Sequence, residues 1–124
     1  MSVMLITHDL GIVAGIAERV AVMYGGRIVE QAPTRALYNN AYHPYTQALL
    51  SVVLEHLGMP QQILVGEMPD PTEISSGCRF HLRCPLVQSG EAQRLGIADR
   101  CTHEDPLLQI SGSQQSVACH AVGV

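Results

Sequence analysis

The sequence contains no lysine and no tryptophan, and it contains a single phenylalanine. Without lysine the chain cannot form a complete P-loop nucleotide site or carry out Schiff-base chemistry, because both need that side chain. Seven arginines stand against eleven acidic residues, and the net charge of −4 argues against a nucleic-acid partner. With so few aromatic residues, aliphatic and methionine side chains must fill most of the core.

Long apolar runs are missing as well. The longest run, residues 48–54, includes Ser51, whereas a membrane-spanning helix needs about 20 apolar residues. The N-terminus lacks a basic segment, and the polar residues Thr7, His8 and Asp9 interrupt its apolar stretch, which is not typical of a signal peptide. We therefore expect a reducing, cytosolic location, where four cysteines indicate metal ligands or redox thiols before disulfides.

Charge and cysteine content divide the chain into two parts. Residues 1–77 carry three arginines and seven acids, whereas residues 78–124 carry four arginines, four acids and all four cysteines. Residues 60–76 contain three prolines and end near a Ser-Ser-Gly sequence, which is typical of a linker. We therefore predict one domain at residues 1–59 and another at residues 77–124, joined by a linker at residues 60–76.

Hydrophobic periodicity predicts the elements of the first part. The apolar run at residues 3–6 predicts a strand covered on both faces, and the helical spacing of apolar residues from 10 to 20 predicts a helix. Residues 20–24 and 27–31 predict two strands joined by Gly25-Gly26 as a hairpin.

Two further helices are expected after the hairpin. Thr34 is a candidate N-cap of a short helix that runs through Asn39. Pro44 suits the first position of a longer helix, because its missing N–H and fixed φ are tolerated there. His43 precedes Pro44 and is expected to cap this helix.

The main candidate site consists of the four cysteines, Cys78, Cys84, Cys101 and Cys119. Their wide spacing differs from the C-x₂-C pairs of common zinc ribbons, so the ligands must converge by folding. Four thiolates suit one Zn²⁺ ion or a [4Fe–4S] cluster, and the spacing does not choose between them. A Cys₃His zinc site that uses His81, His103 or His120 is an alternative, and so are free buried thiols.

The composition of the second part gives a metal or cluster a structural reason. Residues 78–124 hold few large apolar side chains, and so small a domain is marginal without a staple. We therefore expect the site to act first as a structural clamp. Arg79, Arg83 and Arg100 lie near the cysteines in sequence and would offset the negative charge of a four-thiolate site.

Three segments, in the same order, resemble the C-terminal part of an ABC transporter ATPase subunit. The sequence Leu-Ile-Thr-His-Asp-Leu at residues 5–10, with the sequence at residues 17–30, resembles the H-loop strand and the helix and hairpin that follow it. His43-Pro44-Tyr45 and the residues after it resemble a segment of the oligopeptide, dipeptide and nickel importer ATPases. Residues 69–86, with two of the cysteines, are similar to the cysteine-bearing extension of the same subfamily.

The resemblance implies a fold class that combines α+β and α/β features. Residues 1–59 would be a strand–helix–hairpin remnant of the ATPase domain with two following helices, and residues 77–124 a small irregular cysteine-rich lobe. The P-loop, Q-loop, signature motif and Walker B acid, which precede the H-loop in the family, are missing. The chain is therefore expected to be a C-terminal portion of the subunit, inactive in ATP hydrolysis alone, and to dimerise or aggregate through its unpaired strand.

The resemblance also implies roles for the candidate residues. His8 would be the switch histidine that reaches the γ-phosphate of ATP in the complete subunit, although a polar residue that caps a helix is the alternative. The four cysteines would hold a [4Fe–4S] cluster, which we expect ahead of zinc.

The implied partners are membrane-spanning permease subunits and a second ATPase subunit. The protein would lie in the cytoplasm, peripheral on the inner face of the membrane, as a homo- or heterodimer. Peptides are the expected cargo, and nickel is an alternative. The competing interpretations are a stand-alone zinc-stabilised interaction module and a thiol redox protein, although the redox protein lacks the expected C-x-x-C motif.

Overall fold

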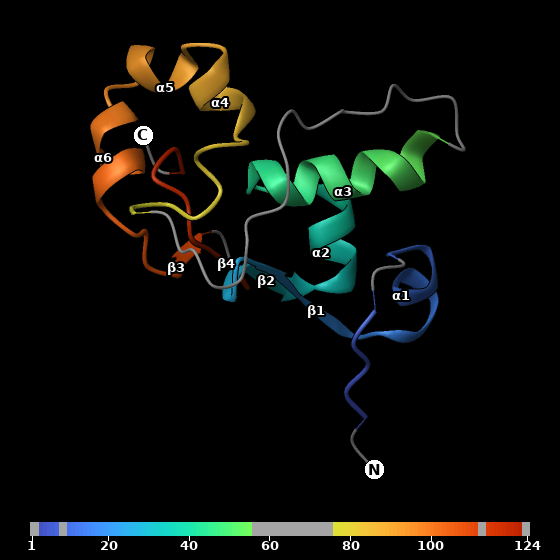
Figure 1. Ribbon diagram of the computed structural model, residues 1–124. Helices are drawn as coiled ribbons and strands as arrows, with labels where there is room; N and C mark the ends of the chain where they lie inside the picture. The colour runs from blue at the N-terminus through green and yellow to red at the C-terminus, as the bar shows by residue number, and fades with distance from the viewer. Residues whose placement is uncertain (1–2, 8–9, 56–75, 112–113, 123–124) are drawn as a thin grey trace.

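The computed structural model describes residues 3–7, 10–55, 76–111 and 114–122. Within these residues one antiparallel sheet has the strand order β1-β2-β4-β3 (Figure 1). The strands are β1 (Arg19–Tyr24), β2 (Arg27–Pro33), β3 (Gln109–Ser111) and β4 (Gln115–Val117). The helices are α1 (Leu10–Ile16), α2 (Thr34–Asn39), α3 (Pro44–Glu55), α4 (Pro85–Gln88), α5 (Glu91–Arg94) and α6 (Ala98–His103).

The predicted hairpin is confirmed. Strands β1 and β2 pair from Arg19 opposite Pro33 to Tyr24 opposite Arg27. The turn between them consists of Gly25 and Gly26, with φ angles of 58° and 81°. Both angles lie in the left-handed region that glycine adopts without a steric cost, which is why this dipeptide closes the hairpin.

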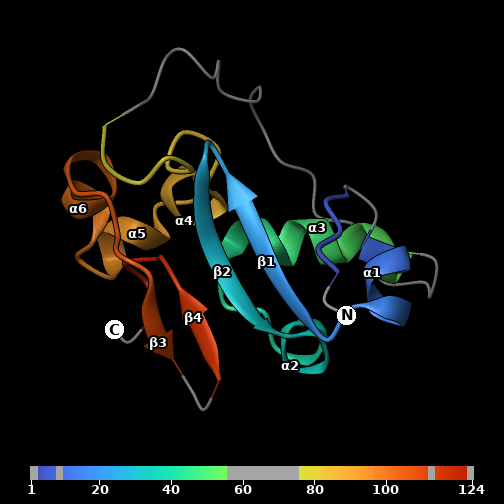
Figure 2. The same cartoon turned by 90° about the horizontal axis from the view of Figure 1, so that it is seen from below.

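The sheet joins sequence from both sides of the predicted linker. Strand β2 pairs with β4, with Glu30 opposite Val117 and Gln31 opposite Ser116 (Figure 2). The amide of Ala118 extends this contact by donating a 2.8 Å hydrogen bond to the carbonyl oxygen of Val29. Most of the linker lies outside the described residues, so the domain boundaries at residues 60–76 stay a prediction.

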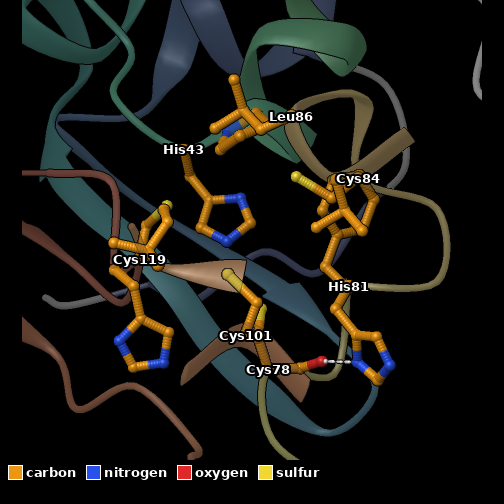
Figure 3. A pocket seen from close by; sticks show the side chains of 12 residues that line it. His43, Cys78, His81, Cys84, Leu86, Cys101 and Cys119 are labelled. Atoms are coloured by element: carbon orange, nitrogen blue, oxygen red, sulfur yellow. Dashed lines mark hydrogen bonds between the residues drawn. The ribbon is translucent and has the colours of Figure 1, made fainter. Parts of the chain in front are cut away.

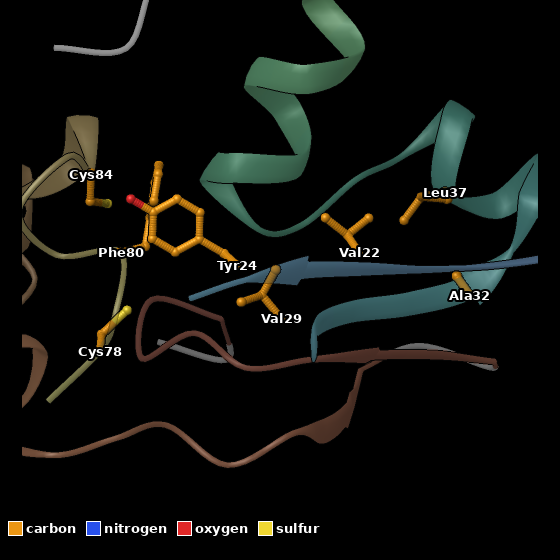
Figure 4. Close-up of a cluster of buried hydrophobic side chains, with 8 residues drawn as sticks. All are labelled: Val22, Tyr24, Val29, Ala32, Leu37, Cys78, Phe80 and Cys84. Atoms are coloured by element: carbon orange, nitrogen blue, oxygen red, sulfur yellow. The ribbon is translucent and has the colours of Figure 1, made fainter. Parts of the chain in front are cut away.

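The main core cluster also draws on both parts of the chain (Figure 4). Its buried members are Val22, Tyr24, Val29, Ala32, Leu37, Cys78, Phe80 and Cys84. Helices α4, α5 and α6 gather on the side of the molecule opposite α1, while α2 and α3 lie beside the hairpin (Figures 1 and 2). The segment that carries Cys78 and Cys84 therefore packs against the hairpin and shares its core, whereas Cys101 belongs to a second cluster with Ala92 and Ile97.

Helix α3 begins at Pro44, as predicted, and Ala48 and Leu50 are buried. Val52, on the same helix, is exposed. None of the helices in the described part of the chain combines the length and apolar character that a bilayer crossing requires.

The prediction of a buried strand at residues 3–6 was wrong. These residues form no strand, and their side chains are 52–90% exposed. A strand of this kind needs hydrogen-bonded neighbours and helices over both faces, and none of the described strands pairs with it. The expectation that this apolar segment promotes association stays a prediction.

Two local expectations also need correction. The helix predicted from residue 10 to residue 20 ends at Ile16, and Val20 lies in β1. Thr34 is not an N-cap, because Pro33 occupies that position and Thr34 is the first residue of α2. The Thr34 hydroxyl instead donates a 2.7 Å hydrogen bond to the carbonyl oxygen of Ala17, a tertiary contact that ties α2 to the end of α1.

Candidate functional site

The four predicted cysteines converge on one cavity, which we call the cysteine cavity (Figure 3). Its lining also includes His43, His81 and His120, together with apolar residues from α4 and the turn after α5. Three of the cysteines are buried, Cys119 is half-buried, and all four are free thiols. The four cysteines, although far apart in sequence, therefore line one cavity, and their role as ligands of a shared group stays a prediction.

Gly77 allows the first and third cysteines to approach each other. The amide of Cys78 donates a 2.9 Å hydrogen bond to the carbonyl oxygen of Cys101, and the Ser76 hydroxyl donates to the carbonyl oxygen of Thr102 at 2.8 Å. Gly77 has a φ of 73°, and a Cβ atom there would lie 2.5 Å from the Cys101 carbonyl oxygen. A side chain at this position would force the two segments apart.

The other two cysteines are positioned by regular elements. Cys84 is the N-cap residue of α4, and Pro85 follows as the first helical residue. Cys119 comes two residues after the end of β4, which is tied to the hairpin by its pairing with β2. Helix α4 and strand β4, which lie far apart in the sequence, therefore position these two thiols at the cavity.

Phe80 is the only phenylalanine in the chain. It joins residues 78–84, which we call the cysteine loop, to the rest of the molecule. Its side chain is 1% exposed. Its ring centroid lies 5.0 Å from that of Tyr24, 5.3 Å from that of Tyr45 and 5.6 Å from that of His43. Tilted and edge-to-face contacts at these distances are favourable beyond the burial of the ring area. One side chain thus connects the hairpin, the start of α3 and the cysteine cavity.

A buried carboxylate that sequence reasoning missed holds the segment before α3. Glu30 is fully buried and accepts hydrogen bonds of 2.9 Å from the amides of Tyr42 and His43, and one of 3.2 Å from the side-chain amide of Gln115. Two of these donors belong to the segment before α3, and the third belongs to the first residue of β4. The available signal was an acidic residue that follows the apolar pair Ile28-Val29 within a predicted strand, because a carboxylate needs partners if it is buried.

His43 caps α3 and faces the cysteine cavity with its other ring nitrogen. Its Nδ1 atom accepts a 3.0 Å hydrogen bond from the amide of Tyr45, which confirms the predicted cap. Burial lowers the pKa of His43 to about 4, so the ring is neutral at neutral pH. Since Nδ1 is an acceptor, the proton lies on Nε2, and that atom is buried with no hydrogen-bond partner among the described residues.

The cysteines are protonated thiols in this state. Burial raises the pKa of Cys78 to about 12 and the pKa of Cys119 to about 11, and negative charge on the neighbouring cysteines raises both further. Burial also raises the pKa of Cys84 and of Cys101, where the charge of Arg100 partly opposes it. Binding of a metal or cluster would therefore release protons.

Backbone amides oppose this rise at three of the four sulfurs. The amide of Phe80 lowers the pKa of Cys78, those of Leu86 and Val87 lower the pKa of Cys84, and those of Ala121 and Val122 lower the pKa of Cys119. Hydrogen bonds of this kind favour the thiolate form. The local backbone is thus arranged to support negative charge on these sulfurs.

The arrangement does not match a site for a single ion. In residues 3–7, 10–55, 76–111 and 114–122, no three His, Cys, Asp or Glu residues are placed to hold one metal ion. A ring nitrogen of His81 lies 2.7 Å from the carbonyl oxygen of Cys78, and one of His120 lies 2.7 Å from that of Glu104. His103 is exposed. The Cys₃His alternative finds no support in these contacts.

The arginines near the cysteines have other partners. Arg79 donates to the carbonyl oxygen of Gly25 in the hairpin turn, and Arg100 pairs with Glu104 at 3.0 Å. The Arg83 guanidinium lies 6.0 Å from the centre of the Tyr24 ring. The charge of Arg100 also lowers the pKa of Cys101. His8 lies outside the described residues, so its role as the switch histidine stays a prediction.

Comparison with known proteins places the chain among transporter subunits. Residues 29–90 match the family model described as the C-terminal region of oligopeptide/dipeptide transporters. A "Probable peptide ABC transporter ATP-binding protein" of Sinorhizobium fredii is 41% identical over 97% of this chain and 32% of its own length.

Two further relatives carry more specific names. The di/tripeptide transport ATP-binding protein DppF of Pseudomonas aeruginosa is 39% identical over 93% of this chain and 33% of its own length. The oligopeptide transport ATP-binding protein AppF of Bacillus subtilis is 36% identical over 97% of this chain and 35% of its own length. The chain thus spans about a third of the length of the curated relatives that it matches.

Proposed function

Because the chain belongs to the family defined by the C-terminal region of oligopeptide/dipeptide transporters, we propose that it is the C-terminal portion of the ATP-binding subunit of a peptide-type ABC importer. The observation that carries this proposal is the similarity of nearly the whole chain to ATP-binding proteins of peptide transport. The subunit would work in the cytoplasm, peripheral to the membrane, with permease subunits and a second ATPase subunit.

In this proposal the chain contributes to ATP hydrolysis only within the complete subunit. His8 would reach the γ-phosphate and help to position the attacking water, a role that works through placement and charge. The chain has no lysine for a P-loop and therefore depends on other sequence for phosphate binding. The expected contribution of residues 1–59 is the switch histidine and the hairpin that follows it.

The second part of the proposal concerns the cysteine cavity, which we assign to a [4Fe–4S] cluster bound by Cys78, Cys84, Cys101 and Cys119. Four free thiols around one cavity, three of them facing backbone amides, suit a group that takes one thiolate per iron. Zinc needs all its ligands about 2.3 Å from one point, whereas a [4Fe–4S] cluster takes one cysteine at each of four irons; the described residues include no group placed to hold a single ion. When bound, the cluster supplies metal–sulfur bonds that hold the surrounding loops together.

Purification without oxygen tests the assignment of the cavity. We expect iron and acid-labile sulfide in equal amounts, visible absorbance that bleaches on reduction, and loss of both in Cys78→Ser. Ser89→Cys, which adds an exposed thiol on the surface, serves as the matched control and should leave the cluster content unchanged. A colourless protein with one equivalent of zinc would instead support the stand-alone zinc-stabilised module, and a protein with neither would remove both metal assignments.

Hydrolysis by the complete subunit in its transporter complex tests the role of His8. We expect His8→Ala to abolish peptide-stimulated ATP hydrolysis and to leave ATP binding intact. His103→Ala changes an exposed histidine and should leave hydrolysis unchanged. Normal turnover by the His8→Ala complex would contradict the proposed role.

A further inference from the structure

His43 presents a hydrogen-bond donor to the cysteine cavity for which the described protein offers no acceptor. Its side chain is 1% exposed, and its Nε2 atom is buried without a partner among the described residues. A buried N–H left without an acceptor costs about 1–3 kcal/mol. A native protein is expected to carry such a cost only where a bound group accepts the hydrogen bond or where the unpaired donor has a function.

The orientation of this donor follows from the backbone around it. The amides of Tyr42 and His43 are held by Glu30, and the amide of Tyr45 donates to Nδ1 of His43. The ring is also packed against Phe80 at 5.6 Å between centroids. These contacts fix the ring on both sides, so that Nε2–H cannot turn toward another partner without loss of the helix cap.

The surroundings of the donor are rich in sulfur. His43 lines the same cavity as all four cysteines, and Figure 3 shows its imidazole among the labelled cysteine side chains. None of the residues that line the cavity has an oxygen in its side chain, whereas thiolate and sulfide sulfurs are good acceptors when they carry negative charge. The acceptor that best matches a neutral N–H donor here is therefore an anionic sulfur.

We propose that Nε2–H of His43 donates a hydrogen bond to a sulfur of the cluster held in the cysteine cavity, or to one of its cysteine thiolates. This inference rests on the proposed cluster. It makes His43 a positioning residue with two connected tasks, because one ring nitrogen caps α3 and the other stabilises negative charge in the cavity. The His-Pro-Tyr sequence thus links the start of α3 to the charge of the cluster.

Two substitutions at this position separate the two tasks. His43→Asn keeps an oxygen near the position of Nδ1, so the cap on the Tyr45 amide is retained, but it has no donor at the position of Nε2. His43→Gln places an amide N–H near the position of Nε2 and gives up the cap. The first variant should therefore change the cluster more than the stability, and the second should change the stability more than the cluster.

The experiment is a redox titration of the anaerobically purified protein, followed by electron paramagnetic resonance, with iron and sulfide content measured on the same samples. Hydrogen bonds to cluster sulfurs favour the reduced, more negative form. We expect the ratio of reduced to oxidised cluster at a fixed potential to fall about ten-fold in His43→Asn, which is about 59 mV for one electron. His43→Gln should stay near the wild-type potential while it unfolds at a lower temperature.

The possible outcomes keep this inference distinct from the cluster assignment. Absence of iron and sulfide in the wild-type protein would contradict the cluster itself. If the wild-type protein holds a cluster and both His43→Asn and His43→Gln keep the wild-type potential, the cluster assignment is retained and the role of His43 is wrong. A fall in potential that occurs in both variants and follows their loss of stability would assign His43 to the helix cap alone.

Discussion

The amide of Cys78 donates a 2.9 Å hydrogen bond to the carbonyl oxygen of Cys101, although 22 residues separate them in the sequence. This contact brings the loop that carries Phe80 against the last turn of α6. It depends on Gly77, because a Cβ atom at that position would meet the backbone of residues 101–103. The hydrogen bond is therefore the point at which the two cysteine-bearing segments are held together.

We predict that Gly77→Ala lowers the free energy of unfolding by about 1–3 kcal/mol. Its φ of 73° is unfavourable for alanine, and its Cβ would lie 2.5 Å from the Cys101 carbonyl oxygen. Urea unfolding followed by circular dichroism measures the effect. Gly90→Ala is the matched control, because Gly90 has a φ of 85° and open space around its Cβ position. An equal loss in the two variants would mean that the close approach at Gly77 contributes nothing.

Local signals in the sequence were sufficient for the hairpin and for the start of α3. The Gly25-Gly26 dipeptide supplies two residues that adopt positive φ, and Pro44 supplies the fixed φ of a first helical residue. His43 could likewise be predicted as a cap from its place before Pro44. These features depend on neighbours within a few residues, which is why the sequence alone indicates them.

Features that depend on distant contacts were not accessible in the same way. Nothing near Glu30 in the sequence shows that its carboxylate accepts from the amide of His43 and the side chain of Gln115. The strand predicted at residues 3–6 failed for a related reason, because an apolar run forms a covered strand only when its partners are present. The cysteine spacing required convergence, and only the fold shows that a histidine nitrogen faces the same cavity.

We predict that Phe80→Ala destabilises the protein by about 3–5 kcal/mol, the usual range for removal of a buried aromatic ring. The ring contacts Tyr24 of the hairpin and both Tyr45 and His43 at the start of α3. Its loss therefore removes the contacts that hold the cysteine loop against these two elements. Thermal and urea unfolding provide the measurement. Leu82→Ala, two residues away and 67% exposed, should change the stability little. A small effect of Phe80→Ala would show that the cysteine loop does not depend on this contact.

We predict that Glu30→Gln destabilises the protein by about 1–3 kcal/mol, because the new amide group turns an N–H toward donors that need an acceptor. Those donors are the amides of Tyr42 and His43 and the side chain of Gln115. The start of α3 should also exchange its amide hydrogens faster, which hydrogen exchange with mass spectrometry detects. Glu91→Gln alters an exposed pair with Arg94 and serves as the control. Unchanged exchange near residue 43 would contradict the role assigned to Glu30.

We predict that acid destabilises the protein through His43. Burial lowers the pKa of His43 from 6.5 to about 4, so between these values the unfolded chain binds a proton that the folded chain does not. Stability from this group is thus fully present above pH 6.5 and is lost as the pH falls toward 4. Since one pKa unit corresponds to about 1.4 kcal/mol, the full loss is roughly 3 kcal/mol.

Urea unfolding of the metal-free protein at several pH values measures this dependence. Comparison of wild type with His43→Asn isolates the histidine, because the other titrating groups are common to both proteins. The stability of wild type should fall toward that of the variant, or below it, as the pH decreases from 6.5 to 4. His103→Asn removes an exposed histidine and should retain the wild-type slope. Parallel pH profiles for wild type and His43→Asn would show that the imidazole of His43 titrates normally and is not held neutral by the fold.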